Sequence, residues 1–368
     1  MTPQVLRWGV LSTAEIGRKN WKGIRNSGNG VVRAVASRTL ERSQRFVEVC
    51  QREAPFETVP QCFGSYQALL DSKDVDAVYI PLPTGLRKEW VIRAADAGKH
   101  VVCEKPCAPN AADLQEMIQA CRRNGKQFMD GVMFMHSSRL AAMRAVLDDP
   151  MSVGEIKRLA FGFSFRAPPE FFTANIRSHG SLEPQGCLGD LGWYCIRFAI
   201  WSLTGQTPRS VTGRMLSHCA RSEGSERVPT EFSAELFFDG GVSASFYCSF
   251  LTEMQQWAHV SGTKGSLRVS DFVLPHFGSE IAFEVAAPAY TVRGCDFDMS
   301  PNSRQIVVPE YSNSHPSSQE SRLFRDFANQ VHSGTLNEDW PVIALKTQRV
   351  LDACRLSADS DGKMIPLD

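Results

Sequence analysis

The sequence has no excess of charge of either sign, because 40 Lys and Arg residues balance 40 Asp and Glu residues. Neither nucleic acid nor an anionic membrane surface is therefore indicated as a partner. No apolar run reaches the roughly 18 residues that a membrane helix needs. The first ten residues, MTPQVLRWGV, do not have the charged-then-apolar pattern of a signal peptide. We expect a cytoplasmic protein whose partners are small molecules or further copies of itself.

Cysteine and histidine motifs are missing as well. The eleven cysteines are odd in number, scattered and never spaced as C-x-x-C, and the eight histidines are dispersed. A disulfide framework and a metal site are therefore not expected, and we interpret the cysteines as reduced core thiols. Cys103 and Cys107 flank Lys105, where small buried residues at a strand end are favoured over a metal or redox role. No H-E-x-x-H, nucleophile-elbow or P-loop motif is present.

What the first third of the chain does have is a regular alternation of strand-like and helical segments. Strands are expected over 5–12, 31–37, 76–83, 100–104 and 126–131, with a weaker one near Gln61. Helices are expected over 14–27, 39–53, 85–98 and 110–125, with a short one begun by Ser65; Thr39, Thr84 and Asn110 are the expected caps. The continuously apolar strands indicate a parallel sheet covered on both faces. Six such strands predict a doubly wound dinucleotide-binding (Rossmann) domain over residues 1–130.

After about residue 131 the pattern changes to longer strands that we expect to be antiparallel. These run over 155–167, 230–250 and 257–271, and Asp239-Gly240-Gly241 predicts a hairpin inside the second. Helices are expected over 191–205, 321–333 and 342–357, and 312–320 is a polar loop. Residues 131–368 are thus predicted to form an α+β domain, with one antiparallel sheet and helices on one side of it.

The first strand ends in Ser12-Thr13-Ala14-Glu15-Ile16-Gly17, which is G-x-G-x-x-G with its first two glycines replaced. A plain strand-to-helix turn would explain these residues about as well. The position favours a phosphate site, because the N-terminus of the following helix offers backbone N–H groups to an anion. We therefore expect the pyrophosphate of a dinucleotide at Ser12, Thr13, Ala14 and Ile16, with the Ser12 hydroxyl as a further donor.

The second strand ends in Ser37-Arg38, where NAD-binding proteins place an acidic residue against the adenosine ribose. An acid would repel a 2′-phosphate, whereas Ser37 and Arg38 attract it, so NADP is the predicted cofactor. Arg42, one helical turn on, is a second candidate contact for this phosphate. Its alternative, slightly favoured, is an ion pair with Glu41 or Glu48 on a solvated helix face.

The stretch KHVVCEKPCA, residues 99–108, places Glu104, Lys105 and Pro106 directly after a buried strand. Burying a carboxylate and an ammonium costs free energy unless they are paired or used. In a doubly wound sheet, ligands bind at the carboxyl ends of the strands. We therefore favour a functional role for Lys105 over the alternative, in which Glu104 pairs with a basic neighbour and Lys105 is exposed.

The longer stretch YIPLPTGLRKEWVIRAADAGKHVVCEKPCA closely resembles the Gfo/Idh/MocA oxidoreductase family. It is most similar to the branch with NADP-dependent D-xylose dehydrogenases, dihydrodiol dehydrogenase and glucose-fructose oxidoreductase. The resemblance extends to the Ser-Thr-Ala turn, the Ser-Arg pair, NIR at 175–177, GDLGWY at 189–194 and WAHVSGTKGSLRV from residue 257. It implies a Rossmann domain, a second domain whose open sheet often forms the oligomer interface, and hydride transfer between nicotinamide and a sugar or polyol.

The resemblance also implies roles for individual residues. The central lysine of the family corresponds to Lys105, and its aspartate and tyrosine, four residues apart, correspond to Asp190 and Tyr194. The implied cofactor contacts around the nicotinamide are Leu82, Pro83, Thr84, Glu104 and Lys105. The chain departs from the family at Arg87, where a histidine is common, and in PQGCLGD at 184–190. Both departures lie near the expected pocket, so the substrate can differ from those of the named relatives.

Oxidation of an alcohol needs a group that accepts the proton from oxygen. Partial burial and a positive nicotinamide disfavour the charged form of lysine, so Lys105 can serve; Tyr194 is the other candidate, and the choice stays open. Tyr194 could instead pack in the core beside Trp193 and Phe198. Asp190 would fix Tyr194 or accept from a sugar hydroxyl, and capping of a helix that starts at Leu191 is compatible with either role.

Three further residues are weaker candidates for substrate contact: Arg177 in NIR, and His136 and Arg139 in MFMHSSR. Packing or a surface ion pair explains each of them equally well. The leading hypothesis is an NADP-dependent dehydrogenase or reductase of a monosaccharide, polyol or diol, best a D-xylose-like sugar, that forms a dimer or tetramer through its second-domain sheet. The rival hypotheses are an NAD-dependent glycoside hydrolase of the same family and an inactive nucleotide-binding regulator.

Overall fold

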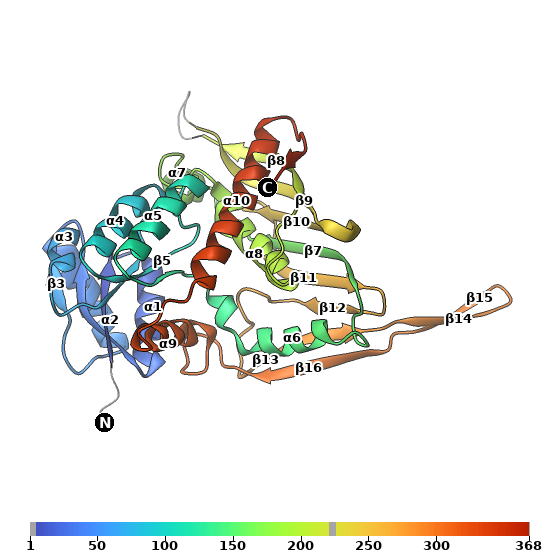
Figure 1. Cartoon of the computed structure of the whole chain (residues 1–368), viewed down its shortest axis with the longest axis horizontal. Helices are drawn as coiled ribbons and strands as arrows, with labels where there is room; N and C mark the ends of the chain where they lie inside the picture. Colours follow the sequence, from blue (N-terminus) through green and yellow to red (C-terminus); the bar gives the residue numbers. More distant parts are fainter. Residues whose placement is uncertain (1–4, 221–225, 368) are drawn as a thin grey trace. The chain divides into compact units, whose positions relative to one another are not determined.

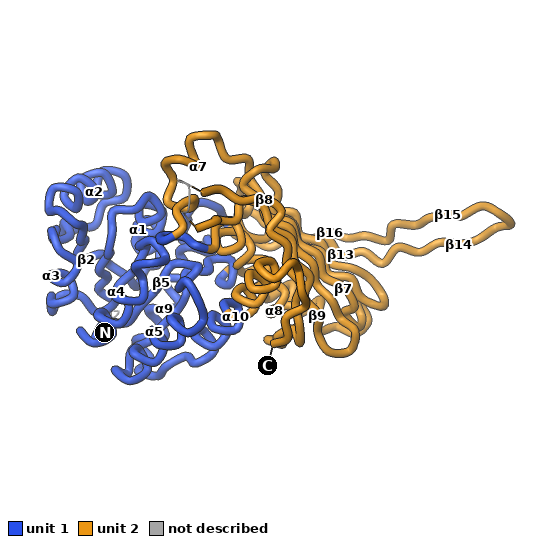
Figure 2. The backbone as a smooth tube through the Cα atoms, turned by 90° about the horizontal axis from the view of Figure 1, so that it is seen from above, with its two compact units in different colours: residues 1–136, 181–184, 311–348 blue, residues 137–180, 185–310, 349–368 orange. Residues whose placement is uncertain are grey.

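The computed structural model describes residues 5–220 and 226–367. Its helices and strands (Figure 1) fall into two compact units (Figure 2). Unit 1 consists of the chain up to His136 together with Ser181–Pro184 and Tyr311–Gln348. Unit 2 consists of Ser137–Gly180, Gln185–Glu310 and the chain from Arg349 onward. The two units therefore alternate along the chain, whereas the sequence analysis drew a single boundary near residue 130.

Unit 1 is built on six parallel strands in the order β3-β2-β1-β4-β5-β6 (Figure 1). The strands are β1 Leu6–Leu11, β2 Gly30–Ala36, β3 Gln61–Phe63, β4 Ala77–Ile80, β5 His100–Cys103 and β6 Phe128–Asp130. This order confirms the predicted doubly wound sheet. The order reverses between β1 and β4, and ligands of such sheets bind at the carboxyl ends of the strands on either side of that reversal.

Helices cover this sheet, and most of them begin as predicted. Their bounds are α1 Glu15–Ser27, α2 Leu40–Glu53, α3 Tyr66–Leu70, α4 Thr84–Asp96, α5 Ala111–Arg123, η1 Met133–His136, α9 Gln319–His332 and α10 Asp339–Asp359, of which α10 runs on past the end of unit 1. The side chains of Thr39, Ser65 and Asn110 accept the capping hydrogen bonds that the sequence predicts. The predicted cap at Thr84 is wrong, because Thr84 is the first helical residue and Pro83 holds the cap position.

The return of the chain to unit 1 has a clear cause in the aromatic residues of α9. The ring of Phe324 packs edge-on against Trp8 of β1, with ring centroids 5.2 Å apart, and Phe327 lies 5.3 Å from the same indole. Trp8 and both phenylalanines are almost completely buried. Without α9, this apolar part of β1 would face water, so the Rossmann sheet of this chain needs a helix supplied from far along the sequence.

Unit 2 contains a nine-stranded sheet in the order β16-β13-β12-β11-β7-β10-β9-β8-β17. The strands are β7 Ile156–Ser164, β8 Ser210–Cys219, β9 Val228–Phe237, β10 Ser243–Ser249, β11 Gln255–Gly262, β12 Ser266–Val269, β13 Glu280–Ala286, β16 Ser303–Pro309 and β17 Ile365–Pro366. The predicted hairpin is present: β9 and β10 are joined through η4, Asp239–Gly241, where both glycines have positive φ. One correction concerns β7 and β10, which pair in parallel, so the sheet is mixed rather than wholly antiparallel.

One face of this sheet carries the apolar core of unit 2. The helical segments of the unit are α6 Ser138–Asp148, α7 Phe171–Ala174, η2 Ile176–Ser178, η3 Leu188–Gly192 and α8 Trp193–Ser202. Phe198 of α8 packs against Phe161 of β7 and against Phe272, with ring centroids 5.7 and 5.4 Å apart. The opposite face is partly exposed and carries small side chains, such as Ala160 and Ser245, together with the larger Arg158, Glu235 and Tyr247. The predicted arrangement of helices against one face is consistent with this packing.

A long hairpin continues from the edge of the sheet. Strands β14, Ala289–Arg293, and β15, Asp296–Ser300, pair only with each other and extend beyond β13 and β16 (Figures 1 and 2). The sequence analysis assigned no structure to this segment. Among the described residues, no helix is long and apolar enough to cross a membrane.

Candidate functional site

The carboxyl end of β5 holds the Glu104-Lys105-Pro106 triplet, and Glu104 is anchored there by side chains of β4 and α1. Tyr79 donates from its hydroxyl to Glu104 Oε1 at 2.6 Å, and Asn20 donates to the same oxygen at 3.3 Å. Burial, together with the adjacent Glu104 carboxylate, holds the pKa of Tyr79 well above its usual range. Tyr79 therefore remains a proton donor, which fixes the orientation of Glu104.

Lys105 is half-buried two residues beyond the last residue of β5. Its backbone N–H donates to Glu104 Oε2 at 3.3 Å, and the Lys105–Pro106 peptide bond is cis. The position lies at the carboxyl edge of the parallel sheet, next to the reversal of strand order. The short turn after β5 thus fixes the backbone at Lys105 and also holds the Glu104 carboxylate beside it.

Arg87 of α4 is the main anchor of this turn. Its guanidinium donates to the Leu82 carbonyl at 2.6 Å, to the Glu104 carbonyl at 2.9 Å and to the Pro106 carbonyl. The side chain is 5% exposed. Arg87 stood out in the sequence as a departure from the family pattern near the pocket; in the structure it ties the end of the β4 loop to the residues on both sides of Lys105.

Leu82, Pro83 and Thr84, the predicted cofactor contacts after β4, lead into the start of α4. Thr84 is fully buried, and its hydroxyl donates to Glu183 Oε2 at 2.6 Å while its backbone N–H donates to Glu183 Oε1 at 3.0 Å. Leu82 is buried and Pro83 is partly exposed. Glu183, which the sequence analysis did not single out, therefore occupies the N-terminus of α4, where a negative charge is stabilised by the helix dipole.

The predicted phosphate turn has an unusual backbone. Ser12 has a φ of 141°, a conformation that favours glycine, and it stands where the first glycine of the motif is expected. Its Oγ accepts from the Ala14 N–H at 3.1 Å. Ala14 is the N-cap of α1 and has no side-chain oxygen to cap it. A Cβ on Gly17 would lie 3.2 Å from the Phe46 ring, so this glycine serves close packing of α1.

The end of β2 carries the predicted adenosine site. Ser37 is buried with its Oγ 3.4 Å from Thr13 Oγ1, and Arg38 and Arg42 are exposed. The positive charges of both arginines act on Tyr66 and oppose the rise in its pKa that burial causes. Arg38 and Arg42 are therefore both near one half-buried ring, Tyr66, which the sequence analysis did not identify.

The alternative role considered for Arg42 is not what the structure shows. Glu41 pairs with Arg45 at 2.5 Å, and Glu48 pairs with Arg52 at 2.7 Å, each one helical turn along α2. The backbone N–H of Arg42 donates to Thr39 Oγ1, and the positive charge of Arg42 acts on Tyr66. Arg38 and Arg42 together form a basic patch at the end of β2, as a 2′-phosphate would need.

In unit 2, two motifs that are distant in sequence come together. Arg177 Nε lies 2.8 Å from Asp190 Oδ2, which joins NIR to GDLGWY. Asp190 lies inside η3, a π-helical turn that leads into α8, and not at a helix cap, since the cap position of α8 is Gly192. Such turns are frequent at functional sites because they redirect side chains within a helix. The Asp190 side chain is 15% exposed, against 44% for Arg177.

Tyr194 is the second residue of α8 and is 5% exposed. Its ring packs against Phe163 of β7 with centroids 5.7 Å apart. Trp193 and Phe198, its neighbours in the core alternative, are fully buried. Tyr194 is thus held rigidly between α8 and the sheet, four residues after Asp190.

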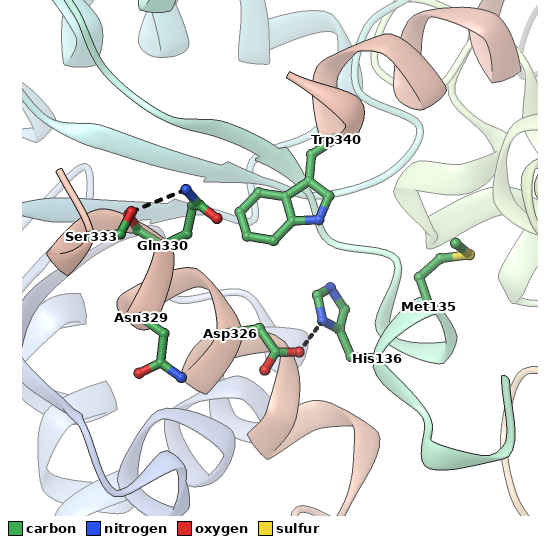
Figure 3. Close-up of a pocket in the computed structure, with 7 residues that line it drawn as sticks. All are labelled: Met135, His136, Asp326, Asn329, Gln330, Ser333 and Trp340. Carbon is green, nitrogen blue, oxygen red and sulfur yellow. Dashed lines mark hydrogen bonds and ion pairs between the residues drawn. The ribbon is translucent and has the colours of Figure 1, made fainter. Parts of the chain in front are cut away.

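His136 and Arg139 have ion-pair partners within their own units. His136 Nδ1 lies 2.8 Å from Asp326 Oδ2, beside Trp340, in an open pocket of about 430 Å³ lined by η1, α9 and α10 (Figure 3). Arg139 is 1% exposed and binds Asp271 through Oδ1 at 2.5 Å and the carbonyl at 2.7 Å. Arg139 is therefore a buried ion-pair residue of unit 2, which favours the packing alternative over the substrate contact considered for it.

The structure thus brings the predicted residues together in two groups. Unit 1 holds the phosphate turn, the basic patch at β2 and the anchored Lys105 turn, whereas unit 2 holds Arg177, Asp190 and Tyr194. Cys103 and Cys107 are fully buried, and burial raises the pKa of the Cys107 thiol. Within the described ranges, 5–220 and 226–367, no cluster of three metal-ligating side chains occurs.

Comparison with known proteins defines the class to which these features belong. Residues 6–132 match the family model described as "Oxidoreductase family, NAD-binding Rossmann fold", and residues 140–268 match the GFO/IDH/MocA C-terminal domain. The chain belongs to the Gfo/Idh/MocA oxidoreductase family. This confirms the resemblance seen in the sequence.

Several relatives are similar over most of the chain. Trans-1,2-dihydrobenzene-1,2-diol dehydrogenase of Mus musculus is 30% identical over 274 residues, 73% of this chain and 76% of that protein. D-xylose 1-dehydrogenase (NADP(+)) 2 of Haloferax volcanii is 30% identical over 363 residues, 99% of this chain and 100% of that protein. The crystal structure of KijD10, a 3-ketoreductase from Actinomadura kijaniata in complex with NADP and TDP-benzene, superimposes with a TM-score of 0.79 at 27% identity, over 96% of this chain and 98% of that chain.

Proposed function

We propose that the chain is an NADP-dependent dehydrogenase or reductase of a CH–OH group in a monosaccharide, polyol or diol, with a D-xylose-like sugar as the first candidate. The observation that carries the proposal is the anchored turn after β5, which holds Lys105 at the carboxyl edge of a parallel sheet. The relatives act on a dihydrodiol, on D-xylose and on a keto group, so the shared chemistry is at a C–O carbon.

NADP fits the residues of unit 1. The N-terminus of α1 has no side-chain cap at Ala14, and its N–H groups suit a pyrophosphate beside Ser12, Thr13 and Ile16. The patch of Ser37, Arg38 and Arg42 suits the 2′-phosphate, with Tyr66 as a ring for the adenine. Leu82, Pro83, Thr84, Glu104 and Lys105 surround the nicotinamide end. When bound, NADP supplies the acceptor or donor of a hydride.

Lys105 acts on the oxygen of the substrate in this proposal. Its ammonium donates a proton to that oxygen in the reduction, and the neutral amine, which partial desolvation favours, accepts the proton of the alcohol in the oxidation. Glu104 fixes the turn, because its carboxylate accepts from the Lys105 backbone N–H and from Tyr79. Tyr194 is the second candidate for the proton, and we propose that Asp190, oriented by Arg177, accepts from a neighbouring hydroxyl of the substrate. His136 is a further candidate contact.

We also propose that the enzyme is a homo-oligomer that packs through the open face of its nine-stranded sheet. That face carries small side chains, for example Ala160 and Ser245, beside larger polar and aromatic ones such as Arg158, Glu235 and Tyr247, so a second sheet would meet a mixed surface of the kind that interfaces use. A Cβ on Gly162 would lie 2.6 Å from the Trp257 indole nitrogen, so the absence of a side chain at Gly162 leaves room for this indole. A dimer or tetramer is the expected assembly.

The decisive experiment is a screen of sugars, polyols and diols with NADP⁺, and of ketoses and dicarbonyls with NADPH, followed by nicotinamide absorbance. Lys105→Met is expected to abolish turnover while NADPH binding, measured by its fluorescence, stays close to that of the wild type. Lys88→Met, on α4 and paired with Asp113 at 2.7 Å, is the control and should keep its activity. Turnover near the wild-type rate in Lys105→Met would refute the mechanism.

Cofactor choice has its own test. Arg38→Ala should reduce the preference for NADP⁺ over NAD⁺ by about tenfold to a hundredfold, since it removes a charged contact to the 2′-phosphate. Arg45 lies on α2, just after Arg38 in the sequence, and pairs with Glu41. Arg45→Ala should leave the preference for NADP⁺ over NAD⁺ unchanged. An unchanged ratio in Arg38→Ala would remove Arg38 from the site. Cleavage of a glycoside without net change in nicotinamide absorbance would instead favour a hydrolase.

A further inference from the structure

The hairpin formed by β14 and β15 has one apolar and one polar face. Residues opposite each other in an antiparallel pair lie on the same face, and the register pairs Tyr290 with Met299 and Val292 with Phe297. The rings of Tyr290 and Phe297 lie 6.1 Å apart, which confirms that they share a face. These four side chains are between 53% and 69% exposed.

The other face of the hairpin is polar and forms its own contacts. It carries Thr291, Arg293, Asp296 and Asp298, and Arg293 pairs with Asp298 at 3.1 Å. All ten residues of β14 and β15 are exposed. An isolated two-stranded hairpin is only marginally stable in water, so the apolar face needs a covering surface for the hairpin to persist.

We propose that this hairpin is an arm that packs its apolar face on a second copy of the same chain. The surface area that the arm can bury agrees with that of a stable dimer interface. At these exposed fractions the four side chains offer on the order of 400 Å². In a two-fold symmetric pair, two arms and two receiving surfaces together bury about 1,600 Å², the size of a standard stable interface.

Continuity and charge favour a second copy over other occupants. The arm extends β13 and β16 of the nine-stranded sheet, and β16 is the edge strand of that sheet, with Val307 48% exposed. The arm therefore begins at an unpaired sheet edge, which can itself accept a strand or pack against another chain. Its charged residues are one arginine and two aspartates, a balance that does not suit an anionic membrane surface.

The experiment compares the full-length wild type with charge-insertion variants by sedimentation velocity over a range of protein concentrations. Phe297→Asp places a carboxylate on the apolar face and should raise the dimer dissociation constant by about a hundredfold or more, because each dimer loses two anchors. Ala289→Asp places the same charge on the polar face, in the first residue of β14, and should leave the constant within about threefold. Circular dichroism checks that both variants are folded.

A second variant keeps the test independent of the folding of the arm. Replacing residues 288–301 by Asn-Gly closes β13 and β16 with a short turn and should weaken self-association as much as Phe297→Asp does. A wild type that stays monomeric up to about 100 µM, or arm variants that dimerise like the wild type, would overturn the proposal.

The arm and the open sheet face can be told apart. Ser245→Arg places a large charge on the open face, away from the arm. If Ser245→Arg separates the copies and the arm variants do not, the proposed sheet interface stands and the arm proposal is wrong. Nicotinamide-linked activity is recorded separately, since the arm proposal does not depend on the substrate or the cofactor.

Discussion

Arg87→Met tests the anchoring of the Lys105 turn. The substitution removes the donors to three carbonyl oxygens, those of Leu82, Glu104 and Pro106, from a side chain that is only 5% exposed. Hydrogen bonds from a charged donor contribute about 1.5–3 kcal/mol each, and part of this is offset because the buried charge is removed as well. We expect the free energy of unfolding to fall by about 3–5 kcal/mol.

The assay is unfolding in urea, followed by tryptophan fluorescence, with Arg93→Met as the matched control on the same helix. Arg93 is half exposed, pairs with Glu89 at 2.8 Å and lies over the Trp90 ring, so its loss should cost less than about 1 kcal/mol. The turnover rate of the folded Arg87→Met protein should also fall, because Lys105 loses its position. NADPH binding should be less affected than turnover. Equal losses of stability in the two variants would refute the anchoring argument.

Three further predictions follow from single contacts. His100 accepts from a backbone N–H at 3.0 Å, and burial lowers its pKa from 6.5 to about 4. As the pH falls, the unfolded state therefore binds a proton before the folded state does, and the free energy of unfolding should fall by about 2 kcal/mol between pH 7.5 and pH 5.0. This pH dependence must vanish in His100→Gln. Ser12→Gly should be about 1 kcal/mol more stable in urea than Ser12→Ala, and equal stabilities would contradict backbone strain there. Arg177→Gln should lower kcat/KM about tenfold by releasing Asp190, whereas exposed Arg166→Gln should not.

The fold could be predicted from local sequence wherever a helix or strand buries one face against a neighbouring layer, because the burial leaves a periodic apolar pattern in the sequence. The alternation of apolar strands and amphipathic helices in the first third was sufficient for the doubly wound sheet, and Asp239-Gly240-Gly241 for the hairpin. The parallel pairing of β7 with β10 and the return of residues 311–348 to unit 1 depend on contacts between residues more than 75 positions apart. The arm was missed because its two strands pair with no other strand in the described part of the chain, so no burial pattern marks them in the sequence.

The candidate site divides in the same way. Lys105, Ser37 and Arg38 stand at strand ends, which a periodic pattern locates. Arg87 and Glu183 were not assigned their roles, because each acts on backbone groups that only the folded chain brings near. The sequence did contain a signal for Arg87. It is an arginine near the start of a helix, on a face that is otherwise apolar, and a buried arginine needs several hydrogen-bond acceptors.

The interleaving of the two units along the chain has a consequence for how the protein is made. Trp8 leaves the ribosome long before its covering partners, Phe324 and Phe327, which lie more than 300 positions further along the chain. The Rossmann sheet must therefore wait, with part of its surface uncovered, while all the strands of the other unit up to β16 are produced. A fragment that ends after β6 would keep that exposed surface permanently, so aggregation of the shortened protein is the expected result.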